Sequence, residues 1–255
     1  MILLIDIGNT RLKWAELRDG TLSAQSAFAH SGGDRARLLE EMQKRVATPE
    51  RVLIANVGGP EIQAACVNAV RTRWNVEPEL VVASARAAGV TNAYRDPEKL
   101  GVDRWLAMIA ARAMKPGALC VVSVGTAMTV DGLDATGRHL GGVIVPGPKL
   151  MVASLLGNTS DIAARATQTE STDGLFADHT FGAIHQGARH ALAALIERAI
   201  TEIERTLRTR PQVLITGGAC ERVAALLESS YEVVSDLVLR GLARIADSGS
   251  EEEDE

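Results

Sequence analysis

The stretch Ile5-Asp6-Ile7-Gly8-Asn9-Thr10 decides how the rest of the chain can be interpreted. The apolar run 1–5 before it predicts a buried strand, the small residues after Ile7 predict a turn, and residues 11–17 predict a second strand. Such a turn lets backbone N–H groups approach a phosphate, and Asp6 at the strand end could hold Mg²⁺ directly or through water. An ordinary hairpin in which Asp6 caps the turn explains the same residues, so this stretch alone leaves both interpretations open.

The same design returns in the second half of the chain. Residues 119–131 read Leu-Cys-Val-Val-Ser-Val-Gly-Thr-Ala-Met-Thr-Val-Asp, with Gly125 where the first copy has Gly8. The next turn glycines, Gly20 and Gly137, keep the same offset. Two hairpins in register, one in each half, predict a duplicated domain whose two phosphate loops hold one nucleotide between them.

Composition excludes several classes of protein. The 255 residues carry a net charge of −5, and the five acidic residues of the tail 251–255 account for all of it. A body without positive excess, in which only 3% of residues are aromatic, is a poor nucleic-acid binder, so no nucleic-acid partner is expected. The tail from residue 248 onward is expected to be disordered.

Cysteine usage and hydropathy predict a cytoplasmic protein with no membrane partner. The three cysteines are far apart, lack CxxC spacing and are expected to be reduced packing residues, with a nucleophilic thiol as the alternative (Cys66, Cys120 and Cys220). Asp6 interrupts the first apolar run, which argues against a signal peptide. No apolar stretch approaches the roughly 20 residues of a membrane span.

Periodicity and turn residues predict three strands followed by alternating helices and strands in each half. The expected strands are 1–7, 10–17, 21–28, 51–55, 79–82, 118–124, 127–133, 138–145 and 212–215. The expected helices are 34–46, 61–74, 103–114, 149–156, 181–208, 219–228 and 236–246, with irregular segments at 83–101 and 158–179.

This repeated βββαβαβ order predicts an α/β protein with the duplicated actin-like ATPase (ribonuclease H-like) fold and a nucleotide cleft between its domains. The expected domains are residues 1–116 and 117–247, followed by the tail 248–255.

Four further places in the chain could carry chemistry. The hydroxyl of Thr126 could donate to a phosphate oxygen, or Thr126 could be an ordinary polar strand residue. In Gly101-Val102-Asp103-Arg104, the Asp could orient an attacking hydroxyl and the Arg could clamp an anion. Asp103 could equally be the N-cap of the helix that follows. Tyr94 and Thr180 could hydrogen-bond a polar substrate, or be a packed loop aromatic and a helix cap.

Taken in this order, these residues resemble the type III pantothenate kinases, the bacterial family first described through Bvg accessory factor proteins. The resemblance runs through nearly the whole chain. The segments that carry it are 6–10, Asn92, Tyr94, 100–104, 125–131, 141–147, Thr180, Ile184 and Gly187.

The resemblance implies a commonly homodimeric kinase of the acetate/sugar kinase–Hsp70–actin superfamily. Such an enzyme uses ATP and Mg²⁺ to phosphorylate the primary hydroxyl of pantothenate to 4′-phosphopantothenate, the first step of coenzyme A biosynthesis. By position, the ATP phosphates would contact Asp6, Ile7, Gly8, Asn9, Thr10, Arg11, Leu12, Lys13 and Thr126. Asp103 would be the general base, and pantothenate would be held by Tyr94, Gly101, Val102, Asp103, Arg104 and Thr180.

One position departs from the family pattern. Many members carry an Asp at the position of Ser123, where it binds a monovalent cation, and a neutral serine oxygen would hold K⁺ or NH₄⁺ much more weakly. Dependence on these ions is therefore expected to be reduced or lost. Two alternative functions stay open at this point: a transcription-related regulatory protein, and another superfamily enzyme such as a sugar kinase or polyphosphate phosphatase.

Overall fold

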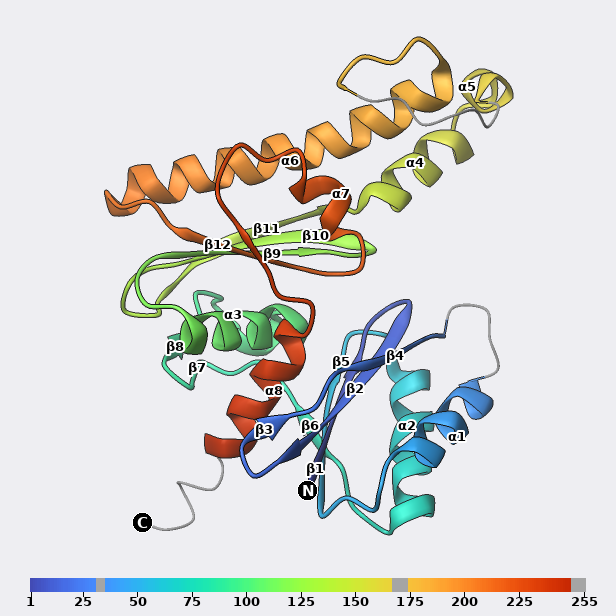
Figure 1. Ribbon diagram of the computed structural model, residues 1–255, viewed down its shortest axis with the longest axis vertical. Coiled ribbons are helices and arrows are strands. Elements are labelled where there is room, and N and C mark those ends of the chain that lie inside the picture. The colour runs from blue at the N-terminus through green and yellow to red at the C-terminus, as the bar shows by residue number, and fades with distance from the viewer. Residues whose placement is uncertain (31–34, 167–173, 249–255) are drawn as a thin grey trace. The chain divides into compact units, whose positions relative to one another are not determined.

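The computed structural model describes residues 1–30, 35–166 and 174–248, which form two compact α/β units (Figure 1). The first unit comprises Met1–Pro116 and the C-terminal segment that begins at Asp236. The second unit is Gly117–Ser235. Of the tail expected to be disordered, residues 249–255 lie outside the described residues, and Ser248 is the last residue of a helix. No helix in the described part of the chain is long and apolar enough to span a membrane.

The first unit is built on a mixed sheet with the strand order β3-β2-β1-β5-β6, and β4 also pairs with β2. β1 is antiparallel to β2 and parallel to β5. In chain order the elements are β1 (Ile2–Ile7), β2 (Arg11–Arg18), β3 (Thr21–Leu22), β4 (Ser26–Ala29), α1 (Arg35–Arg45), β5 (Arg51–Asn56), α2 (Pro60–Trp74) and β6 (Glu79–Val81). The single strand expected at 21–28 is therefore two short strands.

Alternation along the central strand β1 explains why helices cover both faces of this sheet. Successive side chains of a strand point to opposite faces. Leu3, Ile5 and Ile7 pack in a core that includes residues of α1 and α2. Leu4 packs on the other face against α3 (Val102–Met114) and α8 (Leu237–Ser248).

The C-terminal helix α8 packs within the first unit, although the second domain was expected to extend to residue 247. Its apolar face, with Leu239 and Leu242, joins the core formed by α3 and the sheet. A Cβ at Gly241 would lie 2.1 Å from the carbonyl oxygen of Leu106, so glycine lets α8 approach α3 closely. The segment 83–101, expected to be irregular, contains a short hairpin and a 3₁₀ turn: β7 (Arg86–Ala87), β8 (Val90–Thr91) and η1 (Pro97–Lys99).

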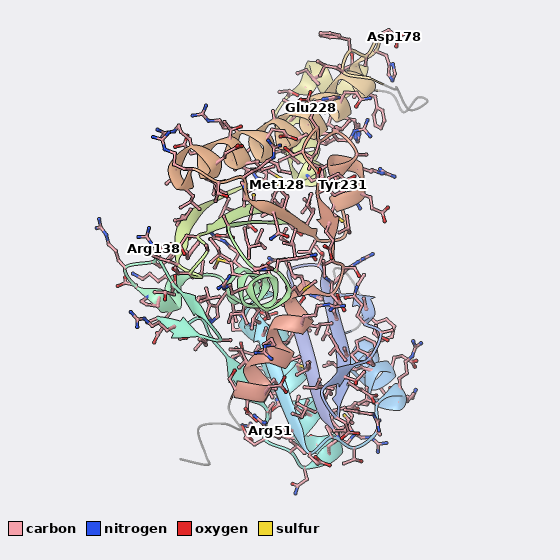
Figure 2. All side chains as sticks on the ribbon, turned by 60° about the vertical axis from the view of Figure 1, so that its left-hand side comes forward. Arg51, Met128, Arg138, Asp178, Glu228 and Tyr231 are labelled. Carbon is pink, nitrogen blue, oxygen red and sulfur yellow. The ribbon has the colours of Figure 1, made fainter. Side chains whose placement is uncertain are left out.

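The second unit repeats the architecture with the strand order β11-β10-β9-β12-β13. Its elements are β9 (Leu119–Val124), β10 (Ala127–Leu133), β11 (His139–Pro146), α4 (Pro148–Gly157), α5 (Ser160–Arg165), α6 (Thr180–Leu207), β12 (Gln212–Thr216), α7 (Cys220–Ala224) and β13 (Glu232–Val233). One face of the sheet packs against α6 and α7, and Met128, labelled in Figure 2, lies in this core.

The equal strand order in the two units agrees with the expected duplicated α/β fold. Three local predictions were wrong in the second unit. The segment expected to be a loop contains α5, the helix expected at 219–228 ends at Ala224, and β13 was not foreseen. β13 has only two residues and pairs with β12 through them, so it leaves no period in the sequence.

Candidate active site

The β1–β2 hairpin of the first unit ends in the loop 8–11, whose residues Asn9, Thr10 and Arg11 are exposed. The N–H of Gly8 donates to the carbonyl oxygen of Arg11 at 2.9 Å and closes the loop. Below it, Asp6 is the cross-strand neighbour of Lys13 in the antiparallel register. The hairpin expected from the sequence is therefore present, and an acidic and a basic residue, Asp6 and Lys13, are cross-strand neighbours just below its loop.

A second segment supports this loop from the end of β5. An ideal Cβ at Gly58 would lie 2.7 Å from the carbonyl oxygen of Gly8, so only glycine fits there without a shift. The side-chain oxygen of Asn56 accepts the N–H of Gly58 at 2.9 Å, and the N–H of Val57 donates to the Ile7 carbonyl at 2.8 Å. The sequence analysis missed this role, although a glycine pair following an apolar strand was a usable signal.

Asp6 is buried, with 7% of its surface exposed. Burial raises the pKa of its carboxyl to about 6; Lys13 lowers the pKa, and the nearby carboxylate of Asp103 raises it. The first unit thus holds two carboxylates, Asp6 and Asp103, close enough for their negative charges to repel each other. A divalent cation near Asp6 would relieve both the burial cost and this repulsion.

Asp103 lies in the first turn of α3, and the N-cap interpretation is wrong for it. The helix begins at Val102 with Gly101 as its N-cap residue. The Oδ1 atom of Asp103 accepts the N–H of Arg104 at 2.9 Å. A Cβ at Gly101 would lie 2.8 Å from that Oδ1, so glycine at 101 leaves room for the carboxylate.

Arg104 and Tyr94 form a second cluster at the start of α3. Arg104 is buried at 4% exposure, and its Nη1 donates to the Tyr94 hydroxyl at 2.8 Å. Asn92 orders the preceding loop: its Oδ1 accepts the N–H of Tyr94 at 3.0 Å, while its Nδ2 donates to the carbonyls of Ser84 and Pro97. The loop residues that the sequence singled out are therefore brought together.

The second hairpin has a shorter loop than the first. The N–H of Gly125 donates to Ala127, two residues on, whereas that of Gly8 donates to Arg11, three residues on. Thr126 therefore corresponds to Thr10, and Asn9 has no counterpart, so the two loops are not in strict register. At the base of the hairpin, Ser123 pairs with Thr129 where the first unit pairs Asp6 with Lys13.

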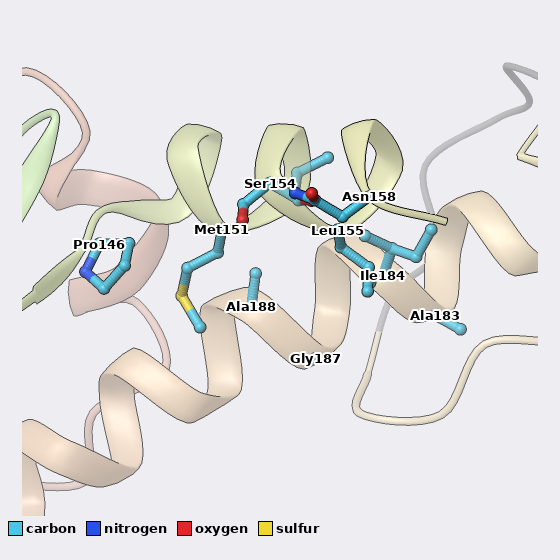
Figure 3. A pocket seen from close by; sticks show the side chains of 10 residues that line it. Pro146, Met151, Ser154, Leu155, Asn158, Ala183, Ile184, Gly187 and Ala188 are labelled. Carbon is cyan, nitrogen blue, oxygen red and sulfur yellow. The ribbon is translucent and has the colours of Figure 1, made fainter. Parts of the chain in front are cut away.

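Thr180 is the first residue of α6, in the second unit, and is partly buried. It lines a pocket of about 570 Å³ together with Asp178, His179 and the apolar residues Leu155, Ile162, Ala177, Ala183 and Ile184. A neighbouring groove of about 660 Å³ runs between α4 and α6, and its lining is mostly apolar (Figure 3). Thr180 thus stands at the polar edge of an apolar surface.

Comparison with known structures defines the class of protein first. A protein from Campylobacter jejuni described as a candidate Baf family transcriptional activator superposes with a TM-score of 0.61 at 21% identity, over 98% of this chain and 99% of that chain. A candidate 2-dehydro-3-deoxygalactonokinase from Sinorhizobium meliloti superposes with a TM-score of 0.59 at 14% identity, over 98% and 99% of the two chains. The fold is that of the actin-like ATPases and sugar kinases.

Sequence comparison narrows this class to one family. Residues 2–202 match the family model for type III pantothenate kinase. The type III pantothenate kinase of Nitrosococcus oceani is 39% identical over 251 residues, which cover 96% of this chain and 94% of the relative. The chain belongs to the type III pantothenate kinase family, and the resemblance noted in the sequence is confirmed.

Proposed function

We propose that this protein transfers the γ-phosphoryl group of ATP to the primary hydroxyl of pantothenate, forming 4′-phosphopantothenate in the first step of coenzyme A biosynthesis. The observation that supports the proposal is the exposed loop next to the buried Asp6, in the same unit that carries Asp103 in the first turn of α3. The family supplies the identity of the acceptor alcohol and of the phosphoryl donor.

Asp6 fits a Mg²⁺ ion, because its carboxylate is buried and its charged form is disfavoured until a cation arrives. Among the described residues, no three His, Cys, Asp or Glu side chains cluster as a metal site. Mg²⁺ commonly needs only one or two carboxylates, with water and substrate phosphates completing its shell. Bound Mg²⁺ would neutralise charge on the transferring phosphate.

The loop formed by Asp6, Ile7, Gly8, Asn9, Thr10, Arg11, Leu12 and Lys13 would bind the phosphates of ATP. Its backbone N–H groups approach an anion without side-chain obstruction at Gly8. Lys13 is a point charge suited to a phosphate oxygen. In the second unit the exposed hydroxyl of Thr126 would donate to a phosphate oxygen, as Thr10 would in the equivalent position of the first.

Asp103 would act as the general base. As the pantothenate oxygen bonds to the γ-phosphorus, the bond to the β–γ bridging oxygen breaks, ADP leaves, and the hydroxyl proton passes to Asp103. Because the transition state is loose, the general base needs little basicity, and the carboxylate of Asp103 held at the start of α3 is sufficient.

Pantothenate would be held by the segment from Gly101 through Val102 to Arg104, by Tyr94 and by Thr180. The buried guanidinium of Arg104 matches the planar carboxylate of pantothenate, and the Tyr94 hydroxyl fixes the orientation of that guanidinium. We include the family's homodimer in the proposal; sedimentation of the purified chain measures it directly.

The proposal is tested by measuring ADP release with pantothenate and with a panel of small alcohols and sugars. Pantothenate is expected to be the preferred acceptor by at least tenfold in kcat/KM. A sugar preferred over pantothenate would contradict the proposal.

A paired substitution tests the base. We expect Asp103→Asn to fold normally, since the Asn oxygen can still accept the N–H of Arg104, and to lose roughly 10² or more in kcat. Asp96→Asn makes the same chemical change on a carboxylate that is 64% exposed and pairs with Lys99, so it should leave turnover unchanged. Retained turnover in Asp103→Asn would remove Asp103 from the mechanism.

A further inference from the structure

A histidine outside every segment singled out above holds the candidate phosphate loop. His30 directly follows β4, and it is buried at 6% exposure. Its Nε2 lies 2.7 Å from the carbonyl oxygen of Gly8, and its backbone N–H donates to the carbonyl of Thr10 at 3.0 Å. Because a carbonyl only accepts, Nε2 must carry the hydrogen of this bond.

The internal duplication shows which part of this arrangement is common to both units. Arg11 of β2 pairs with Ala29 of β4, just as Ala127 of β10 pairs with Pro146 of β11. His30 therefore corresponds to Gly147, the residue after β11. The N–H of Gly147 donates to the carbonyl oxygen of Thr126 at 2.8 Å, as the N–H of His30 donates to that of Thr10. Both units therefore hold the hairpin loop with the same backbone hydrogen bond.

The side chain at this position is what differs. A Cβ at Gly147 would lie 2.1 Å from the carbonyl oxygen of Gly125, so the shorter loop of the second unit packs directly on the backbone of a glycine. The longer loop of the first unit cannot use that packing. Its Gly8 carbonyl is instead held by the imidazole of His30 on one side and approached by Gly58 on the other.

Fixing this carbonyl fixes the next N–H. A trans peptide is planar, and its C=O and N–H point in opposite directions. With the Gly8 oxygen turned toward His30, the N–H of Asn9 points away from it, and Asn9 is an exposed residue of the loop. A rotation of this peptide would present an oxygen where an anion needs a donor.

We propose that His30 is a positioning residue for ATP, which orients the Gly8–Asn9 peptide so that the loop offers N–H groups to the phosphates. The inference rests on the proposed function in one respect, the use of loop 8–11 as the phosphate loop. His30 itself touches neither nucleotide nor acceptor, and it would affect the reaction only through the loop.

The test compares His30→Leu with His30→Gln in the full chain. Leu keeps the bulk and removes the donor, whereas the Gln amide can donate to the same carbonyl. Phe28→Leu is the matched control, because Phe28 lies on the same strand β4 and its ring packs on Trp14 at a centroid separation of 5.0 Å. Binding of a non-hydrolysable ATP analogue with Mg²⁺ is measured by calorimetry, and KM is measured separately for ATP and for pantothenate.

We expect His30→Leu to weaken analogue binding and raise KM for ATP by roughly tenfold. KM for pantothenate should change less than twofold, and His30→Gln and Phe28→Leu should bind the analogue within about threefold of the unchanged protein. Equal weakening in Leu and Gln, or unaltered binding in Leu, overturns the inference. If the unchanged protein binds the analogue but does not phosphorylate pantothenate, the proposed function fails while the role of His30 is still decided by the binding series.

Discussion

Replacing Asp6 by Asn is expected to abolish phosphoryl transfer and yet to make the metal-free protein more stable. The carboxyl is 7% exposed, and its pKa stands at about 6 against an ordinary 3.8. Below pH 3.8 the group is protonated in both the folded and the unfolded state. Between 3.8 and 6 only the folded state retains the proton, so the free energy of unfolding falls as pH rises.

The size of the effect follows from the pKa change. At about 1.4 kcal/mol for each change of one in pKa, the rise from 3.8 to about 6 costs the folded protein about 3 kcal/mol above pH 7. At pH 5 about half of this cost is present, because the folded group is still mostly protonated. Asn has similar shape and no charge, so Asp6→Asn should recover up to these amounts.

The three tryptophans make the assay specific for the first unit. Trp14, Trp74 and Trp105 all belong to it and are all buried. Urea unfolding followed by tryptophan fluorescence in EDTA, at pH 5 and pH 8, therefore gives the stability of the unit that contains Asp6. The stability gain of Asp6→Asn should be larger at pH 8. A variant that is less stable than the unchanged protein, or a gain equal at both pH values, would refute the reasoning.

Four further results are expected. Gly101→Ala should lower kcat roughly tenfold or more, because the added Cβ would lie 2.8 Å from Asp103 Oδ1 and displace the carboxylate. The backbone itself accepts alanine at φ −55°, and Gly157→Ala, whose Cβ would enter open space, is the control. Tyr94→Phe should raise KM for pantothenate roughly fivefold, since the hydrogen bond from Arg104 Nη1 to the Tyr94 hydroxyl is lost. Exchanging K⁺ for a bulky inert cation should leave the rate nearly unchanged, and Ser123→Asp should create a dependence. A thiol reagent at pH 8 should react with the native protein only slowly and label all three cysteines in urea, because burial raises the pKa of Cys66 and Cys120 to about 12 and Cys220 is also buried.

The parts of the structure that the sequence predicted are those with local signals. The strand before Asp6 is a run of apolar residues, the loop after it is made of small residues, and α3 begins just after a glycine. Each of these is decided within about ten residues by hydrophobic period and turn preference. The repeated order of strands and helices along the chain followed, because each half repeats the same sequence of such signals.

The parts that were missed depend on pairing across the chain. Gly58 matters only because β5 lies beside β1, and His30 matters only because β4 pairs with β2. The glycine pair after β5 is visible in the sequence, but the pairing of the strands cannot be read from the residues themselves. The same holds for α8: a helix was expected at 236–246, but nothing in the sequence says that it packs on α3 rather than on the sheet that precedes it in the chain.

The two hairpins also explain why duplication does not give two equal sites. Asp6 with Lys13 in the first unit corresponds to Ser123 with Thr129 in the second, so a buried carboxylate occupies this hairpin position in the first unit and not in the second. A second buried carboxylate of the same kind would cost about another 3 kcal/mol, a large fraction of the 5–15 kcal/mol by which proteins are typically stable. Because only the first loop has the extra residue Asn9 and the imidazole of His30, the same unit holds both the charge and the added N–H donor. The chemistry of phosphoryl transfer is therefore expected to be far more sensitive to substitution in the first hairpin than at matching positions of the second.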